Sequence, residues 1–102
     1  MLTYTREDII RRSSDKLGCS YSEVKITLES ILDTMALMLI EEHSNIRIEL
    51  RNFGVFEVKP TKPKARARNP KTNEEFHIPS RKKVRFKAGK MIKDVIKQEW
   101  KV

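Results

Sequence analysis

The sequence predicts an α+β fold, in which a pair of helices precedes a small antiparallel sheet and a further helix follows it. The main evidence is a change in hydrophobic period near residue 45, from three or four residues to two. These are the periods of amphipathic helices and of strands with one buried face. The length of 102 residues fits one domain with three regions, which we place at 1–45, 46–86 and 87–102.

Two helices are expected in the first region. The first begins after Thr5, whose hydroxyl can cap it, and ends at about Leu17, where Gly18 can take left-handed backbone geometry. The second begins at Ser20, which is followed three residues later by a glutamate as in a capping box, and ends near residues 43–45. Because the link between them is very short, we expect a helical hairpin.

Alternating apolar residues predict the strands of the second region. Two strands are expected at about 46–51 and 55–59, joined by a turn over residues 52–54. A further short strand is expected at 84–86, which completes a three-stranded antiparallel sheet. The phenylalanines of these strands are assigned to core packing and not to base stacking.

Residues 60–74 contain three prolines and no large apolar residue, so they do not belong to a core. Every second position from 62 to 68 is basic, so in an extended strand four cations would share one face, roughly 6.6 Å apart. These cations are Lys62, Lys64, Arg66 and Arg68. A turn at 69–73 and a returning strand at 75–78 complete a projecting β-ribbon arm, at about 60–77.

A last helix is expected within residues 87–102. Its apolar stripe consists of Met91, Ile92, Val95 and Ile96. Lys87, Lys90 and Lys93 gather near its start, where the helix dipole is already positive. A bound phosphate would make this arrangement favourable, because it would meet both the lysines and the free N–H groups of the first turn.

Charge is distributed unevenly along a chain whose formal net charge is +8. Residues 1–50 hold six basic and nine acidic residues, a net charge of −3. Residues 51–102 hold sixteen basic and five acidic residues, a net charge of +11. This layout predicts a polyanion-binding surface with nucleic acid as the leading partner, and a plain solvated face is the competing interpretation.

The sequence carries no motif for catalysis or metal binding. Cys19, His43 and His77 are too few and too scattered for a zinc site, and phosphate-binding loops and nucleophile elbows are absent. We therefore expect no enzyme activity, no metal, no cofactor and no small-molecule substrate. The lone cysteine, the charged start and a longest apolar run of only residues 35–40 predict a cytoplasmic protein without a membrane segment.

Three segments share one family pattern. They read Phe-Gly-Val-Phe-Glu-Val at 53–58, Ala-Arg-Asn-Pro-Lys-Thr-Asn at 67–73 and Phe-Lys-Ala-Gly-Lys-Met-Ile-Lys-Asp at 86–94. These segments resemble the HU and integration host factor family of bacterial histone-like DNA-binding proteins. The resemblance extends over nearly the whole chain and implies an HU-like intertwined dimer. In that dimer, helices form the base, sheets form a saddle and two arms reach around DNA.

The resemblance implies an architectural protein that binds double-stranded DNA through the minor groove, bends it and helps to compact the bacterial nucleoid. Pro70 at the arm tip would wedge between base pairs, and Arg68 and Asn69 would contact the groove beside it. The other contacts would be phosphate contacts without base readout. The full set expected to bind DNA is Lys59, Lys62, Lys64, Arg66, Arg68, Asn69, Pro70, Lys71, Arg81, Lys82, Lys83, Arg85, Lys87, Lys90 and Lys93.

Alternatives stay open at the level of the sequence. An RNA- or ribosome-associated basic protein is the main alternative function, and a binder of anionic membrane surfaces is the second. The sequence does not separate site-specific from nonspecific binding, because specificity depends on DNA deformability as well as on contacts. It also leaves open whether the partner subunit is identical, as in a homodimer, or different, as in a heterodimer.

Overall fold

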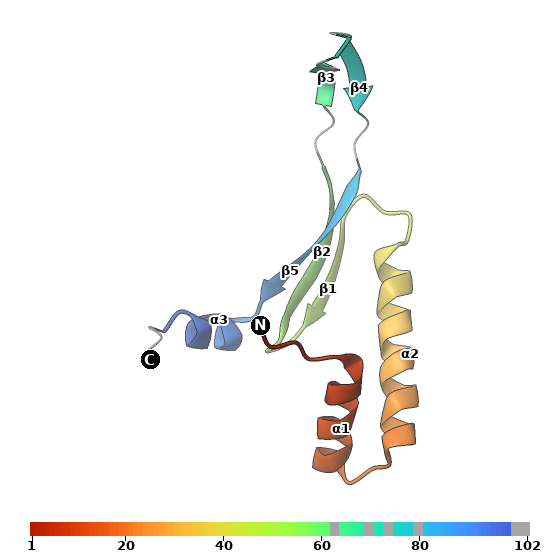
Figure 1. Cartoon of the computed structure of the whole chain (residues 1–102), viewed down its shortest axis with the longest axis vertical. Helices are drawn as coiled ribbons and strands as arrows, with labels where there is room; N and C mark the ends of the chain where they lie inside the picture. The colour runs from red at the N-terminus through yellow and green to blue at the C-terminus, as the bar shows by residue number, and fades with distance from the viewer. Residues whose placement is uncertain (62–63, 69–70, 73–74, 79–80, 99–102) are drawn as a thin grey trace. The chain divides into compact units, whose positions relative to one another are not determined.

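The computed structural model describes residues 1–61, 64–68, 71–72, 75–78 and 81–98, with the backbone alone for 64–68 and 75–78. The chain divides into two compact units, Met1–Glu41 and Glu42–Val102. The first unit holds two helices, and the second holds a sheet, a two-stranded ribbon and a third helix (Figure 1).

The first unit is the predicted helical hairpin, formed by α1 (Arg6–Leu17) and α2 (Tyr21–Leu39). At the start of α1, the N–H and the hydroxyl of Thr5 both donate to Asp8 Oδ2, at 2.8 and 3.0 Å. The helix ends at Gly18, whose φ of 68° is left-handed. Ser20 Oγ then accepts a hydrogen bond from the N–H of Glu23 at 3.2 Å and so begins α2. Both predicted N-cap residues are confirmed, but the Thr5 hydroxyl donates to Asp8, whereas that of Ser20 accepts a helix N–H as predicted.

Helix α2 ends at Leu39, so the predicted end near residues 43–45 is wrong. Its C-cap residue, Ile40, donates its N–H to Ala36 O at 3.2 Å. Two glutamates follow, Glu41 and Glu42. Carboxylates are unfavourable at the carbonyl end of a helix, where the dipole is already negative, and α2 has no basic residue in its last turn to offset them.

The hairpin buries little of its apolar surface. In α1 Ile10 is 2% exposed, and Ser14 is buried beside it with its hydroxyl donating to Arg11 O. No residue of α2 is buried. Leu37, for example, is 65% exposed and Ile31 is 51% exposed. An exposed apolar surface of this kind is typical of a protein interface.

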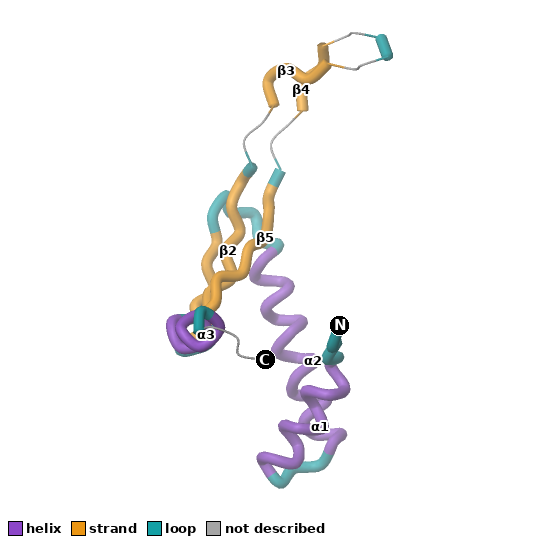
Figure 2. The backbone as a smooth tube through the Cα atoms, turned by 60° about the vertical axis from the view of Figure 1, so that its left-hand side comes forward, coloured by secondary structure: helices purple, strands orange, loops and turns teal. Residues whose placement is uncertain are grey.

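The second unit contains the predicted three-stranded antiparallel sheet. Its strands are β1 (Ile46–Leu50), β2 (Gly54–Pro60) and β5 (Lys82–Ala88), in the order β1-β2-β5 (Figure 1). Figure 2 shows the paired strands β2 and β5 side by side. Together with the hairpin and α3 (Lys90–Ile96), this sheet confirms the predicted fold class.

Side chains alternate between two faces of the sheet, and one face is apolar. Val58 is 2% exposed and is paired with Ile46 on one side and Val84 on the other. Two residues along β2, Phe56 is paired with Phe86, and their ring centroids are 4.9 Å apart. Cross-strand apolar pairs of this type are the main source of sheet stability.

A tight turn joins β1 to β2 and requires glycine at its end. Asn52 takes a left-handed backbone with φ of 67°, which asparagine tolerates better than most residues. A Cβ on Gly54 would lie 2.5 Å from the carbonyl oxygen of Lys87 and 2.6 Å from the ring of Phe86. The close approach of β5 to this turn therefore leaves no room for a larger residue at Gly54.

The ribbon is formed by β3 (Lys64–Arg68) and β4 (Glu75–Ile78), which pair antiparallel. The backbone pairing shifts register between Lys64 and Ala67. Where the sheet passes toward the ribbon, Thr61 and Arg81 are hydrogen-bonded to each other through the Thr61 hydroxyl and both backbones.

Helix α3 spans Lys90–Ile96 and follows its N-cap residue Gly89, within the region in which the sequence predicts a last helix. Lys87 and Ala88 belong to β5, because they are paired with Val55 and Gly54 of β2. Trp100, expected to cover this helix or a dimer contact, lies outside the described residues. None of the helices that the structure describes is long and apolar enough to cross a lipid bilayer.

Candidate nucleic-acid interface

The face of the sheet opposite the apolar one is charged. Strand register places Arg47, Glu57 and Arg85 in one row across the three strands, and Lys59 beside Lys83 in the next row. Lys87 lies on the same face, paired with Val55. The five cations of this charged face are Arg47, Lys59, Lys83, Arg85 and Lys87, and all five are exposed.

Glu57 is a buried carboxylate at the centre of the charged face. The residue is 5% exposed. Its oxygens lie 3.4 Å from Lys59 Nζ, 3.4 Å from Lys87 Nζ and 3.9 Å from Arg47 Nε. Burial opposes ionisation of this carboxyl, but the two ammonium groups outweigh burial, so the pKa of Glu57 lies below its usual value.

The outer edge of the charged face has a second, weaker acidic contact. Glu49 of β1 is paired with Arg47 at 3.2 Å, and both side chains are more than half exposed. Solvent-exposed ion pairs of this kind contribute little stability. Glu49 therefore offsets part of the charge of Arg47, and both side chains stay accessible to water.

A hollow of about 600 Å³ lies at the end of the sheet, between the β1–β2 turn and the start of α3. Arg47, Arg51 and Lys90 contribute positive charge to its lining. The backbone N–H of Gly89 is used inside the protein, where it donates to Phe53 O at 2.8 Å. The hollow thus extends the cationic surface from the sheet to α3.

The structure gathers some of the predicted DNA-binding residues and separates others. Lys59, Lys83, Arg85 and Lys87 share the charged face. Lys82 does not, because the register places it on the same side as Val84 and Phe86.

The other predicted DNA-binding residues lie outside the sheet. Lys90 and Lys93 are exposed on α3, and Lys71 and Arg81 are exposed near the ribbon. Lys64, Arg66 and Arg68 are placed by their backbone in β3, and Lys62, Asn69 and Pro70 lie outside the described residues.

Two cations of this region were missed by the sequence analysis. Arg47 lies directly opposite Glu57, and Arg51 lines the hollow beside α3. The signal for Arg47 was available, because it alternates with Ile46 and Ile48 and therefore points away from the apolar face. It was overlooked because it belongs to the half of the chain with a negative net charge.

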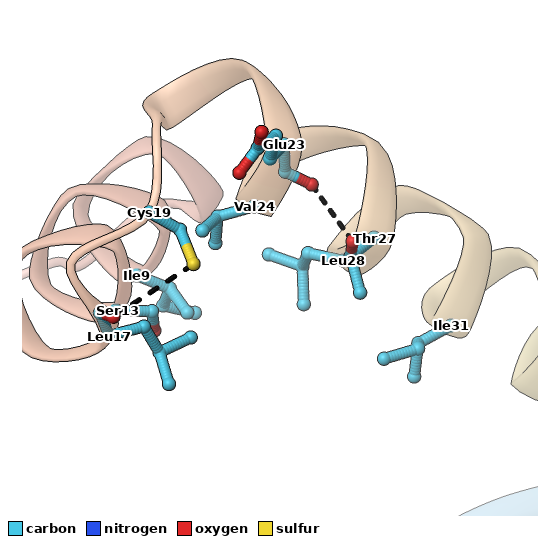
Figure 3. Close-up of a pocket in the computed structure, with 9 residues that line it drawn as sticks. All are labelled: Ile9, Ser13, Leu17, Cys19, Glu23, Val24, Thr27, Leu28 and Ile31. Atoms are coloured by element: carbon cyan, nitrogen blue, oxygen red, sulfur yellow. Dashed lines mark hydrogen bonds between the residues drawn. The ribbon is translucent and has the colours of Figure 1, made fainter.

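A second surface belongs to the helical hairpin. A groove of about 330 Å³ lies between α1 and α2. Figure 3 shows the apolar side chains that line it, which are Ile9, Leu17, Val24, Leu28 and Ile31. Cys19 also lines it, with its thiol 3.9 Å from Leu17 O. Among the described residues, no group of three or more His, Cys, Asp or Glu side chains is placed to hold a metal ion.

Comparison with known proteins defines the class. The family described as bacterial DNA-binding protein matches residues 4–97, and the chain belongs to that family. This confirms the predicted relationship to the HU and integration host factor proteins. The description of the family names DNA binding, which agrees with the nucleic-acid partner expected from the charge layout.

Individual relatives make the relationship specific. The chain is 35% identical to DNA-binding protein HU of Thermotoga maritima over 91% of this chain and 99% of that protein. It is also 35% identical to integration host factor subunit alpha of Thiobacillus denitrificans, over 94% of this chain and 89% of that one. Among solved structures, an Anabaena HU–DNA cocrystal structure superposes with a TM-score of 0.74 at 25% identity, covering 94% of this chain and all of that one.

Proposed function

We propose that this protein binds double-stranded DNA as an architectural protein, and that the charged face of the sheet contacts the phosphate backbone. The observation that carries the proposal is the convergence of five exposed cations from three strands on this one face, in a chain that belongs to a DNA-binding family. DNA carries about one negative charge per 1.7 Å of helix axis, so such a face releases several counterions when it binds.

The ribbon arms would make further contacts with the DNA. The ribbon strands β3 and β4 and the basic residues of β3 support a role in the minor groove. Pro70 would wedge between base pairs and kink the duplex, with Arg68 and Asn69 beside it. DNA bending by this route would help to organise the bacterial nucleoid, and the phosphate contacts would be largely independent of sequence.

Dimerisation is part of the proposal. The exposed apolar residues of α2 and the groove between α1 and α2 support it, because neither is covered within the hairpin. A partner subunit would remove this surface from water. The similarity to both an HU protein and an integration host factor subunit leaves open whether the partner subunit is identical. Sedimentation of the purified protein tests this, because a homodimer forms from this chain alone and a heterodimer does not.

The test of the proposed function is the salt dependence of binding to a short duplex. Each phosphate contact contributes about −0.9 to the slope of log K against log[salt], so a face that makes several such contacts predicts a steep fall of log K with log[salt]. Structured RNA and anionic liposomes are the competitors, and prebent or nicked DNA is the preferred ligand if the role is architectural. Tighter binding to structured RNA would favour the RNA-associated alternative, and a flat salt response would contradict phosphate contact.

Bending is tested separately with Pro70→Ala. Loss of the wedge should reduce the bend angle measured by fluorescence energy transfer between the duplex ends, with a smaller effect on affinity. An unchanged bend angle in this variant would contradict the wedge while leaving the phosphate contacts in place.

A further inference from the structure

The charged face contains a buried acidic group that does not suit a surface for DNA phosphates, the carboxylate of Glu57. Its side chain is only 6% exposed, whereas those of its neighbours Lys59, Lys87 and Arg47 are 55–63% exposed. The negative charge therefore lies beneath the positive charges. A phosphate that approaches this face meets the cations first and the carboxylate behind them.

Every strand of the sheet contributes a charged group to the surroundings of Glu57. Arg47 of β1 and Arg85 of β5 are its direct cross-strand neighbours. Lys59 lies two residues along its own strand, and Lys87 lies diagonally on β5. Glu49 of β1 is the nearby acidic group, paired with Arg47. One buried anion is thus shared by several cations.

The contacts of Glu57 are loose. Both lysine Nζ atoms lie 3.4 Å from Oε2, whereas a strong ammonium–carboxylate hydrogen bond is about 2.7–2.9 Å long. The two ion pairs are therefore long, and both lysine side chains are more than half exposed, so a second anion can reach their ammonium groups.

We propose that Glu57 is a positioning residue that competes with DNA phosphates for Lys59, Lys87 and Arg47, and so limits the affinity of the charged face. The inference rests on the proposed function, since it assumes that this face contacts DNA. A lysine that moves to a phosphate leaves a carboxylate that is too buried for full hydration. That carboxylate also repels the phosphates. Both effects weaken the complex and favour its release.

Glu57→Gln tests the competition, with Glu49→Gln as the matched control. Both variants remove one negative charge from the same face, but Glu49 is exposed and contacts Arg47 alone among the ion pairs described for it. In Glu57→Gln the released lysines should add one or two phosphate contacts, which steepens the log K against log[salt] slope by about 0.9 for each contact. Affinity at ~50 mM salt should rise roughly tenfold, and Glu49→Gln should change both quantities much less.

A purely structural role gives a different result. Removing the central anion would then lower stability through repulsion among the cations, while the salt slope of binding would match that of the control. Equal slopes in the two variants, or weaker binding by Glu57→Gln, would overturn the proposal. If the unchanged protein does not bind duplex DNA, both the proposed function and the competition are wrong. If it binds and the salt slopes of the Glu57→Gln and Glu49→Gln variants are equal, only the competition is wrong.

A double-mutant cycle with Lys87→Gln makes the competition specific. Because Lys87 is partly occupied by Glu57 in the unchanged protein, losing it should cost little affinity there. In the Glu57→Gln background the same change should cost several-fold more, since Lys87 is then free for phosphate. Equal costs in both backgrounds would overturn the competition for this lysine.

A measurement on the unchanged protein avoids dependence on how Glu57→Gln folds. The ¹³C resonance of the Glu57 carboxyl can be titrated with acid, alone and with duplex DNA. If the cations leave for phosphates, the apparent pKa of Glu57 rises when DNA is bound. A pKa that is unchanged or lower in the complex would overturn the proposal, whatever the variant does.

Discussion

Asp8 shows how one side chain can organise the start of a helix. Its Oδ2 accepts both the N–H and the hydroxyl of Thr5, so a single carboxylate serves the capping residue twice. These hydrogen bonds lower the pKa of Asp8 below its ordinary value of 3.8, with the positive charges of Arg11 and Arg12 adding to the effect. A carboxyl whose pKa is lowered in the folded state stabilises that state only while it is ionised.

Asp8→Asn should therefore lower the melting temperature near neutral pH. The difference from the unchanged protein should be fully present above pH 3.8 and disappear as the pH falls below it, through the lowered pKa. Thermal melts followed by circular dichroism between acidic and neutral pH measure this. Asp15→Asn, another exposed carboxylate of α1, is the control. A constant difference at every pH would mean that the charge of Asp8 is not the cause.

Residues also mark the limit of prediction from the sequence. Thr5, Ser20 and Gly18 were identified correctly, because a cap depends on neighbours a few positions away. Glu57 was not, because the cations around it come from three strands that meet only through the register of the sheet. The position of Lys82 on the apolar side likewise needs that register.

At the scale of elements, the hydrophobic period of the sequence was enough to predict the hairpin and the strands, but it did not predict where all of them end. The apolar pattern of α2 continues into Ile40, whereas the helix ends at Leu39, before two acidic residues that are unfavourable at a helix C-terminus. Lys87 and Ala88 looked like the approach to a helix, yet pairing with β2 keeps them in β5. The register shift in the ribbon has no local signal, since it depends on which residue of β4 faces which residue of β3.

The Thr61 hydroxyl adds two hydrogen bonds to the connection between sheet and ribbon, beside the backbone hydrogen bond from the Thr61 N–H to Arg81 O. It donates to Arg81 O and accepts from the Arg81 N–H, both at 3.0 Å, and so continues the ladder beyond the last pair of β2 and β5. Thr61→Val should remove both hydrogen bonds while keeping the shape of the side chain. The net worth of about 1 kcal/mol for a hydrogen bond corresponds to roughly fivefold faster amide exchange at Arg81.

Hydrogen exchange followed by NMR provides the measurement. Thr61→Ser keeps the hydroxyl and is the matched control, so its Arg81 amide should exchange at nearly the original rate. Equal protection of this amide in the valine and serine variants would show that the backbone alone holds the base of the ribbon.

At the scale of the whole molecule, the small buried core of the hairpin predicts that folding and association are coupled. Ile31 is 51% exposed and lines the groove in Figure 3, so it is a suitable site to test the proposed dimer. Ile31→Asp should place a charge in the interface, which is strongly unfavourable without a partner charge. The variant should sediment near the chain mass of 12.0 kDa and melt at a lower temperature.

Ser30→Asp is the control for this variant, because it adds the same charge at the neighbouring exposed position of α2. The control should sediment as the unchanged protein does. Dimers of equal strength in both variants would place the interface elsewhere and leave the groove between α1 and α2 without an assigned partner.

The absence of any buried residue in α2 has a consequence for the life of the protein in the cell. If the proposed dimer forms, newly made subunits would meet proteases before they meet each other, and a subunit that stays alone would present an accessible helix for cleavage. Survival would then rise with abundance, because each added copy shortens the search for a partner. Below the concentration at which subunits find each other, the protein would be degraded, and no separate regulator would be needed for this.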